Sequence, residues 1–173
     1  MSIEGKLFVR EGLLTDPVAQ AFILNGVFTD VESGSKFDTK NRELFQKLSP
    51  RELIGALAQQ GYEVMLGYHE GRIIGYVGFQ EHRNEGEPNW QMFRMKIQPE
   101  YQGKGYSVPL AKSFIEKGRE HRVYRLKWGD EATRNEKMVK LLRILGQKEE
   151  ELGITVDQNS QWLTVKSQNP PVL

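Results

Sequence analysis

The chain has 173 residues with a formal net charge of +1, and 38% of its residues are hydrophobic. This length supports one hydrophobic core, so a single domain is expected over residues 1–166, with residues 167–173 as a flexible C-terminal tail. The near-neutral charge gives no reason to expect nucleic acid or a membrane as a partner, and the absence of cysteine excludes disulfides, thiolate catalysis and cysteine-ligated metals. No metal is expected. Because no apolar stretch reaches the ~20 residues of a membrane span and no signal-peptide core is visible, a cytoplasmic location is expected.

The first part of the chain is predicted to contain two helices and three strands. In chain order these are a strand over 6–14, a helix over 16–28, a polar loop over 29–41, a helix over 50–60, strands over 62–69 and 72–80, and a polar loop over 81–89. The start of the helix over 50–60 is indicated by a capping box, in which Ser49 is followed three residues later by Glu52, with Pro50 at the first helical position. The two adjacent strands are predicted to form a hairpin around Glu70-Gly71.

The second part of the chain is predicted to alternate strands and helices. In chain order these are a strand over 90–97, a helix over 106–118, a strand over 123–128, a helix opened by a capping box at 133–136 and ended by Gly146, and strands over 153–157 and 161–166. The strand, helix and strand from residue 90 to residue 128 form a β-α-β unit. The whole order predicts an α/β fold in which helices pack on a mixed sheet, the α+β arrangement.

A glycine-rich turn joins the strand over 90–97 to the following helix. Gly103 and Gly105 can adopt positive φ and carry no Cβ, so consecutive backbone N–H groups can converge on an anion at the positive end of a helix. Lys104 adds a positive charge between them. Pro109 is compatible with a helix only in its first turn, which places the helix start near Tyr106. This arrangement is suited to holding a pyrophosphate.

With the strand before it, this turn resembles the acetyl-CoA-binding motif of the GNAT N-acetyltransferase superfamily, in which Gln or Arg is followed by two residues, Gly, one residue, and Gly or Ala. Gln102, Gly105 and Ser107 occupy these places, with one small residue substituted by another at Ser107. The resemblance extends over roughly residues 62–146. It implies a GNAT-like fold with a central, mostly antiparallel sheet. It also implies transfer of an acetyl or other acyl group from CoA to a primary amine by direct attack, without a covalent enzyme intermediate.

The resemblance also implies which residues hold acetyl-CoA. The backbone of Met95 and Ile97 should face the acetyl carbonyl and the pantetheine arm. The pyrophosphate should be held by Gln102, Gly103, Lys104, Gly105, Tyr106 and Ser107. Asn135 corresponds to a family asparagine that contacts the CoA arm, although it is equally explained as a residue in the first turn of a helix. The strand over 90–97 can likewise be ordinary core, with the glycines in a surface turn.

Two positions depart from the family pattern. The tyrosine that protonates the leaving thiolate in many members is replaced by Leu142, which the helical spacing explains as a core residue. A strand glutamate that acts as base in some members is replaced by Gln91. The remaining nearby candidates for the base are Glu81, His82, Glu85 and Glu87, of which His82 and Glu81 are taken as the catalytic candidates. Histidine has a suitable unperturbed pKa for general base catalysis, but a histidine in a charged loop is more commonly only solvated.

The acceptor is expected to bind between the first helices and the loops over 29–41 and 81–89, whose carboxylates suit a cationic amine. The acceptor class is a small molecule, an amino-acid-like metabolite or a peptide, and the family resemblance suggests a homodimer. An alternative is a catalytically weak GNAT-fold protein that binds CoA as a sensor or interaction module, which Leu142 and Gln91 favour. A third interpretation is an α/β domain that does not bind CoA.

Overall fold

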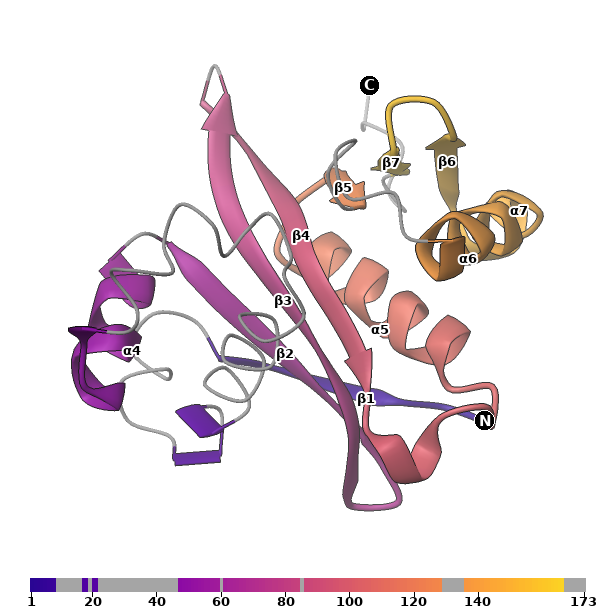
Figure 1. Ribbon diagram of the computed structural model, residues 1–173. Helices are drawn as coiled ribbons and strands as arrows, with labels where there is room; N and C mark the ends of the chain where they lie inside the picture. Colours follow the sequence, from indigo (N-terminus) through magenta and orange to yellow (C-terminus); the bar gives the residue numbers. More distant parts are fainter. Residues whose placement is uncertain are drawn as a thin grey trace.

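The computed structural model describes residues 1–8, 17–18, 20–21, 47–59, 61–84, 86–128 and 136–166. The described strands are β1 Glu4–Phe8, β2 Tyr62–His69, β3 Arg72–Asn84, β4 Glu87–Ile97, β5 Arg125–Trp128, β6 Ile154–Asp157 and β7 Trp162–Val165. The described helices are α4 Pro50–Gln59, the 3₁₀ helix η1 Pro99–Tyr101, α5 Ser107–Glu120, α6 Glu136–Gly146 and α7 Glu149–Leu152. The strands form one sheet in the order β1-β2-β3-β4-β5-β7-β6 (Figure 1). Only the β4–β5 pair is parallel among these strands, which confirms the mixed, mostly antiparallel sheet.

The capping box before α4 is confirmed in both directions. The backbone N–H of Glu52 donates to Ser49 Oγ at 3.3 Å, and the backbone N–H of Ser49 donates to Glu52 Oε2 at 2.8 Å. These bonds favour the charged carboxylate and lower the pKa of Glu52. Residues 17, 18, 20 and 21 are helical, within the predicted first helix. The predicted loop over 29–41, the second capping box and Asn135 lie outside the described residues.

The prediction of a polar loop over 81–89 is wrong. Strand β3 continues to Asn84 and β4 begins at Glu87, so the two strands pair up to a turn in which Gly86 has φ +87°. Figure 1 shows this end of the hairpin projecting beyond the rest of the sheet. A two-stranded ribbon outside the core satisfies its backbone through the ladder and needs no apolar alternation, so hydrophobic periodicity does not detect it.

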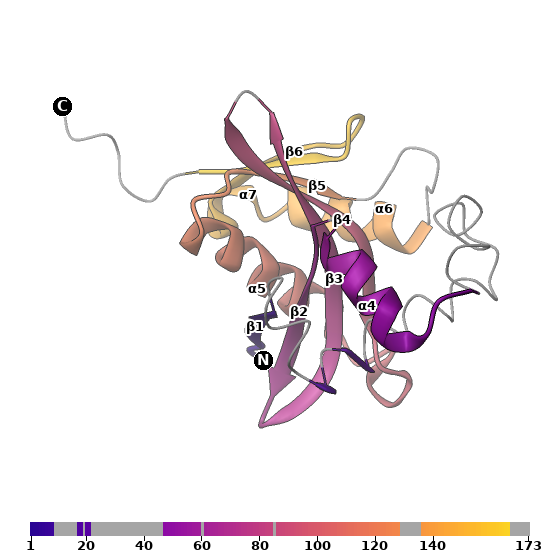
Figure 2. The ribbon, with the colours of Figure 1, turned by 90° about the vertical axis from the view of Figure 1, so that its left-hand side faces the viewer.

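The sheet has two differently covered faces. Helices α5 and α6 pack on one face, called the α5 face, where Phe114 lies 5.5 Å from Trp90 and 5.2 Å from Phe79 between ring centroids. Helix α4 lies on the opposite side of β2, the α4 face, and Figure 2 shows α4 and α5 on the two sides of the central strands. The predicted helical core residues Leu142 and Leu145 are buried with this cluster. The main core is therefore on the α5 face.

Strand β4 separates from β5 part of the way along its length. The parallel pairing joins Asn89–Met92 to Arg125–Trp128, where β5 ends, while β4 continues to Ile97. On its other edge β4 stays paired with β3, but the register shifts so that Phe93 has no partner between Met92 and Arg94. An unpaired residue of this kind is a β-bulge, which bends its strand. Beyond Met92, no described strand pairs with β4 on the β5 side.

Gly75 permits the close approach of β3 to this part of β4. A Cβ built on Gly75 would meet the carbonyl oxygen of Lys96 and would lie 3.1 Å from Ile97 Cα. We therefore expect Gly75→Ala to lower the free energy of unfolding by about 1–3 kcal/mol, the usual cost of overpacking. Gly55→Ala is the control, because its Cβ would meet nothing within 4 Å inside α4. It should raise the same quantity by about 0.5–1 kcal/mol in urea unfolding. A Gly75→Ala protein as stable as wild type would contradict this.

Candidate functional site

The backbone of β4 beyond the bulge faces the open edge at alternate residues. The N–H of Gln98 donates to the carbonyl of Ile74 on β3 at 2.8 Å. In an antiparallel ladder the backbone groups of every second residue point to the same neighbour, so Arg94 and Lys96 also face β3. The N–H and C=O groups of Met95 and Ile97 therefore face away from β3, towards the edge that β5 leaves open. These are the two residues predicted to present backbone groups to an acyl donor.

Two glutamines hold the turn that follows β4. The side-chain amide of Gln98 donates to the carbonyl of Ile73 at 3.0 Å, and that of Gln102 donates to the carbonyl of Ile97 at 3.0 Å. The backbone N–H of Gln102 donates to the carbonyl of Pro99 at 3.3 Å. These bonds of Gln102 fix the path of the chain between β4 and the glycine turn, and its contact to a pyrophosphate stays a prediction.

The glycine turn has the conformation expected from the sequence. Gly103 has φ +74° and Gly105 has φ +82°, and a Cβ built on either would meet nothing within 4 Å. Lys104, between them, is exposed. Helix α5 then begins at Ser107, with Tyr106 as its N-cap and Pro109 in its first turn.

This turn and the start of α5 leave backbone donors available. Among the described residues, no acceptor is found for the backbone N–H groups of residues 103–108. The N-terminal end of a helix also carries a partial positive charge. Lys104 Nζ lies 5.8 Å from the ring centroid of Tyr101, which keeps a full positive charge beside these donors. The arrangement is chemically suited to an anion.

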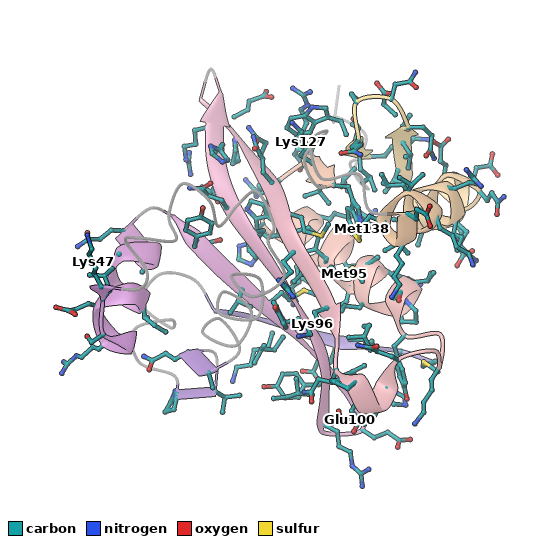
Figure 3. All side chains as sticks on the ribbon, in the orientation of Figure 1. Lys47, Met95, Lys96, Glu100, Lys127 and Met138 are labelled. Atoms are coloured by element: carbon teal, nitrogen blue, oxygen red, sulfur yellow. The ribbon has the colours of Figure 1, made fainter. Side chains whose placement is uncertain are left out.

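An apolar surface lies between β4 and the helices. Met95, Ile97, Val108 and Met138 are partly buried and pack against the main core. Figure 3 labels Met95 on β4 and Met138, which belongs to α6. Tyr106, also partly buried, completes the surface near the glycine turn, where its ring lies 5.5 Å from that of His69. This surface gives an apolar floor to the opening beside β4.

The side chain of Leu142 lies in the core and not at the opening beside β4. It is buried on the inner side of α6, at 2% exposure, which confirms its interpretation as a core residue. Its backbone carbonyl accepts a hydrogen bond from Gln158 Nε2 at 3.1 Å. The described part of α6 therefore has an apolar side chain at the position where the resemblance implies a tyrosine that protonates the leaving thiolate.

The two predicted catalytic residues lie on opposite faces of the sheet. Glu81 pairs with Trp90, whose ring is in the core on the α5 face, and its Oε2 accepts a hydrogen bond from Trp90 Nε1 at 3.2 Å. His82, one residue later, is on the α4 face, where its Nε2 lies 3.1 Å from Gln80 Oε1. The structure does not bring Glu81 and His82 together.

Glu63 is a titratable residue near Glu81 that the sequence reasoning missed. Burial, and then the charge of Glu81, raises the pKa of Glu63 from 4.5 to about 7. Its cross-strand partner is Phe79, so it faces the α5 side of the sheet. The signal was present in the sequence as an acid inside an otherwise apolar strand over residues 62–69.

The raised pKa of Glu63 should make stability depend on pH. Folded protein binds this proton more tightly than unfolded protein does, so the free energy of unfolding should fall as pH rises from 4.5 to about 7. In Glu63→Gln the free energy of unfolding should fall less over this pH range. The variant should therefore be more stable than wild type at pH 8 but not at pH 4. We expect a difference of about 1 kcal/mol at pH 8, because the partial exposure of Glu63 weakens the effect. Urea titrations at both pH values measure the difference, with exposed Glu87→Gln as control. Equal pH profiles for wild type and Glu63→Gln would refute the assignment.

Two kinds of feature are absent from the described residues. No helix there is long and apolar enough to cross a membrane. No group of three or more histidine, aspartate or glutamate side chains there could hold a metal ion.

The fold is shared with solved acetyltransferases. An aminoglycoside acetyltransferase from an uncultured soil metagenomic sample is 14% identical, with a TM-score of 0.55 over 84% of this chain and 91% of that chain. A ribosomal-protein-alanine N-acetyltransferase from Brucella melitensis is 14% identical, with a TM-score of 0.50 over 82% and 90%. An acetyltransferase from Trypanosoma brucei is 18% identical, with a TM-score of 0.51 over 84% and 92%. Identities this low show a common fold.

The family assignment comes from the sequence itself. Residues 28–147 match the model of the acetyltransferase (GNAT) family. This range contains the open edge of β4, the glycine turn and α5. Comparison with curated proteins gave no match. Because the family model spans well over half of the chain, this protein belongs to the acetyltransferase (GNAT) family of enzymes.

Proposed function

We propose that this protein transfers an acetyl group from acetyl-CoA to a primary amine by direct attack of the amine, without a covalent enzyme intermediate. The observation that carries the proposal is the combination of an open β4 edge with an adjoining turn of unpaired N–H groups at the start of α5. The first provides hydrogen bonds for an extended arm, and the second provides a site for phosphates. Family membership is consistent with both.

The residues that would hold acetyl-CoA follow the geometry of this edge. The pyrophosphate would bind the N–H groups of residues 103–107, with Lys104 neutralising part of its charge. The pantetheine arm would lie along the backbone of Met95 and Ile97, above the apolar floor. Asn135 remains a proposed contact to the arm. Bound acetyl-CoA supplies a thioester whose carbonyl carbon is the electrophile.

Backbone donors on β4 can stabilise the charge that develops on the thioester oxygen. The N–H of Met95 faces the open edge, and a fixed donor in a site without water stabilises an oxyanion strongly. The carbonyl of Ile97 is already bonded to Gln102, so it does not compete for the N–H groups of a ligand there. These groups need little rearrangement because β3 holds β4 on its other edge.

The amine must approach from the α4 face. On the α5 face, the space beneath the point where β4 and β5 part is filled by Met92, Trp128 and Leu142 of the core. His82 lies on the α4 face as the cross-strand partner of Asn89, and we propose that it accepts the ammonium proton through a chain of waters. Glu81, on the other face, would instead position Trp90. A thiol pKa near 8.5 permits the CoA thiolate to leave without an acid at position 142.

A second candidate function is CoA binding without efficient transfer. Leu142 cannot protonate a thiolate, and Gln91 cannot accept a proton. Under this interpretation the same cofactor site serves as a sensor or an interaction module. Both functions predict acetyl-CoA binding, so they differ only in whether CoA is released in the presence of amines.

Calorimetric titration with acetyl-CoA tests the cofactor site. Gly105→Trp should abolish binding, because its side chain would fill the open space beside the N–H groups of the turn. Gly86→Trp is the matched control: Gly86 also has positive φ in open space, but it lies in the β3–β4 turn. It should bind like wild type. Absence of binding to wild-type protein would overturn the proposed function.

Steady-state kinetics test the role of His82. His82→Asn should lower kcat about 100-fold or more, while acetyl-CoA affinity is unchanged. Glu81→Gln, which keeps an acceptor for Trp90, should retain kcat within about twofold. If His82→Asn has wild-type kcat, the proton acceptor is another group.

A further inference from the structure

Two cations and an aromatic ring lie together on the α4 face of β5 and β7, where Arg125 is exposed and Lys127 and Trp162 are partly buried. Leu126 and Trp128 of β5 are buried on the α5 face, and so is Leu163 of β7. Alternation along each strand therefore directs their neighbours to the α4 face. These neighbours, called here the Trp162 strip, are Arg125, Lys127 and Trp162.

The Trp162 strip is organised by contacts between its own side chains. Arg125 Cζ lies 4.4 Å from the ring centroid of Trp162, and Lys127 Nζ lies 5.8 Å from it. Lys127 and Trp162 are also direct cross-strand partners. Stacking on the indole holds the guanidinium plane in place, which leaves its N–H groups available along the edge.

The positive charge of the strip is not neutralised within the described residues. Neither Arg125 nor Lys127 forms an ion pair with a described carboxylate. The described carboxylates on this face of strands β3 to β7 are Glu87, at the end of the hairpin, and Asp157. Asp157 is the cross-strand partner of Trp162, and its Oδ1 accepts the backbone N–H groups of Asn159 and Ser160, but no ion pair joins its carboxylate to Arg125 or Lys127.

The strip adjoins the proposed reaction site. In the parallel β4–β5 pair, Lys127 lies opposite Gln91, shortly before the bulge at Phe93. Trp162 lies on the next strand, β7. Neighbouring strands are about 4.8 Å apart, so Lys127 lies one such spacing from β4 and Trp162 lies two. The strip also lies on the α4 face, from which the amine must approach. Along β4, Lys127 is level with Gln91, four residues or about 13 Å before Met95, so the acceptor and the long side chains of the strip must together span this distance.

We propose that the Trp162 strip binds an anionic group, a carboxylate or a phosphate, that is part of the amine acceptor. This inference rests on the proposed function and specifies its substrate class: amines that also carry an anion. Arg125 would bind the anion through its guanidinium edge and Lys127 would add a second charge. Aminoglycosides, which name one of the structural neighbours, are polycations that this strip would repel. Of the carboxylates expected to line an acidic acceptor site, Glu81 faces the other side of the sheet, whereas Glu87 lies on the α4 face at the end of the hairpin.

Matched pairs of acceptors test the inference. β-Alanine and β-alaninamide differ in a carboxylate, whereas O-phosphoethanolamine and ethanolamine differ in a phosphate. We expect wild type to use the anionic member of at least one pair with kcat/KM more than tenfold higher, and the pair that responds identifies the anion. Arg125→Gln and Lys127→Gln should raise KM for that member only. Exposed Lys112→Gln on α5 is the control and should behave like wild type. Equal use of both members of each pair by wild type would overturn the inference.

A spectroscopic arm separates this inference from the proposed function. The indole N–H resonance of Trp162, assigned by its loss in Trp162→Phe, is followed in CoA-saturated protein. It should shift on addition of β-alanine or O-phosphoethanolamine and remain unchanged with the neutral partners. A shift without turnover would mean that the transferase function fails while the anion site stands. Turnover of amines without a shift of the Trp162 resonance and without a preference for the anionic members would mean that the transferase function stands while the anion site fails.

Discussion

The unpaired residue at Phe93 lets β4 stay paired with β3, in a shifted register, after its pairing with β5 has ended. Every other feature of the site depends on this separation. A sheet that stayed continuous would use the backbone groups of Met95 and Ile97 in its own ladder. Because the bulge bends the strand, those groups lie at an internal edge, held from behind by β3. The protein thus keeps a short length of unpaired strand inside its sheet.

Close packing underneath keeps the opening from collapsing. Helix α5 lies so near β1 and β2 that a Cβ at Gly5 would meet Ser113, and one at Gly67 would meet Leu110. The aromatic side chains of Phe79, Trp90 and Phe114 fill the space between this helix and the central strands. Such a core cannot shift to fill a gap without losing contacts. Helix α5, which follows the glycine turn, therefore also supports the open edge of β4.

Features that depend on only one or two neighbouring residues could be predicted from the sequence. The capping box at Ser49, the positive φ of Gly105 and the start of α5 each follow from one or two residue types, and each is found. The hairpin over 81–89 was missed because pairing outside a core leaves no apolar pattern. The separation of Glu81 from His82 depends on strand alternation, which can be assigned only once residue 81 is known to be in a strand. The burial of Glu63 depends on its position against distant segments, as does the position of Trp162 beside Arg125.

The hydrogen bond from Gln102 to the carbonyl of Ile97 has a consequence for anything that pairs with this edge. An extended chain bound there behaves as an added strand, and added strands can slide in steps of two residues while keeping their hydrogen bonds. The Gln102 amide occupies the last acceptor of β4, so the ladder available to a ligand ends at a fixed point. Gln102 thus acts as a stop that sets the register. When the phosphates of a ligand bind the glycine turn on one side of Gln102, the length of the ligand determines how far its other end reaches along β4.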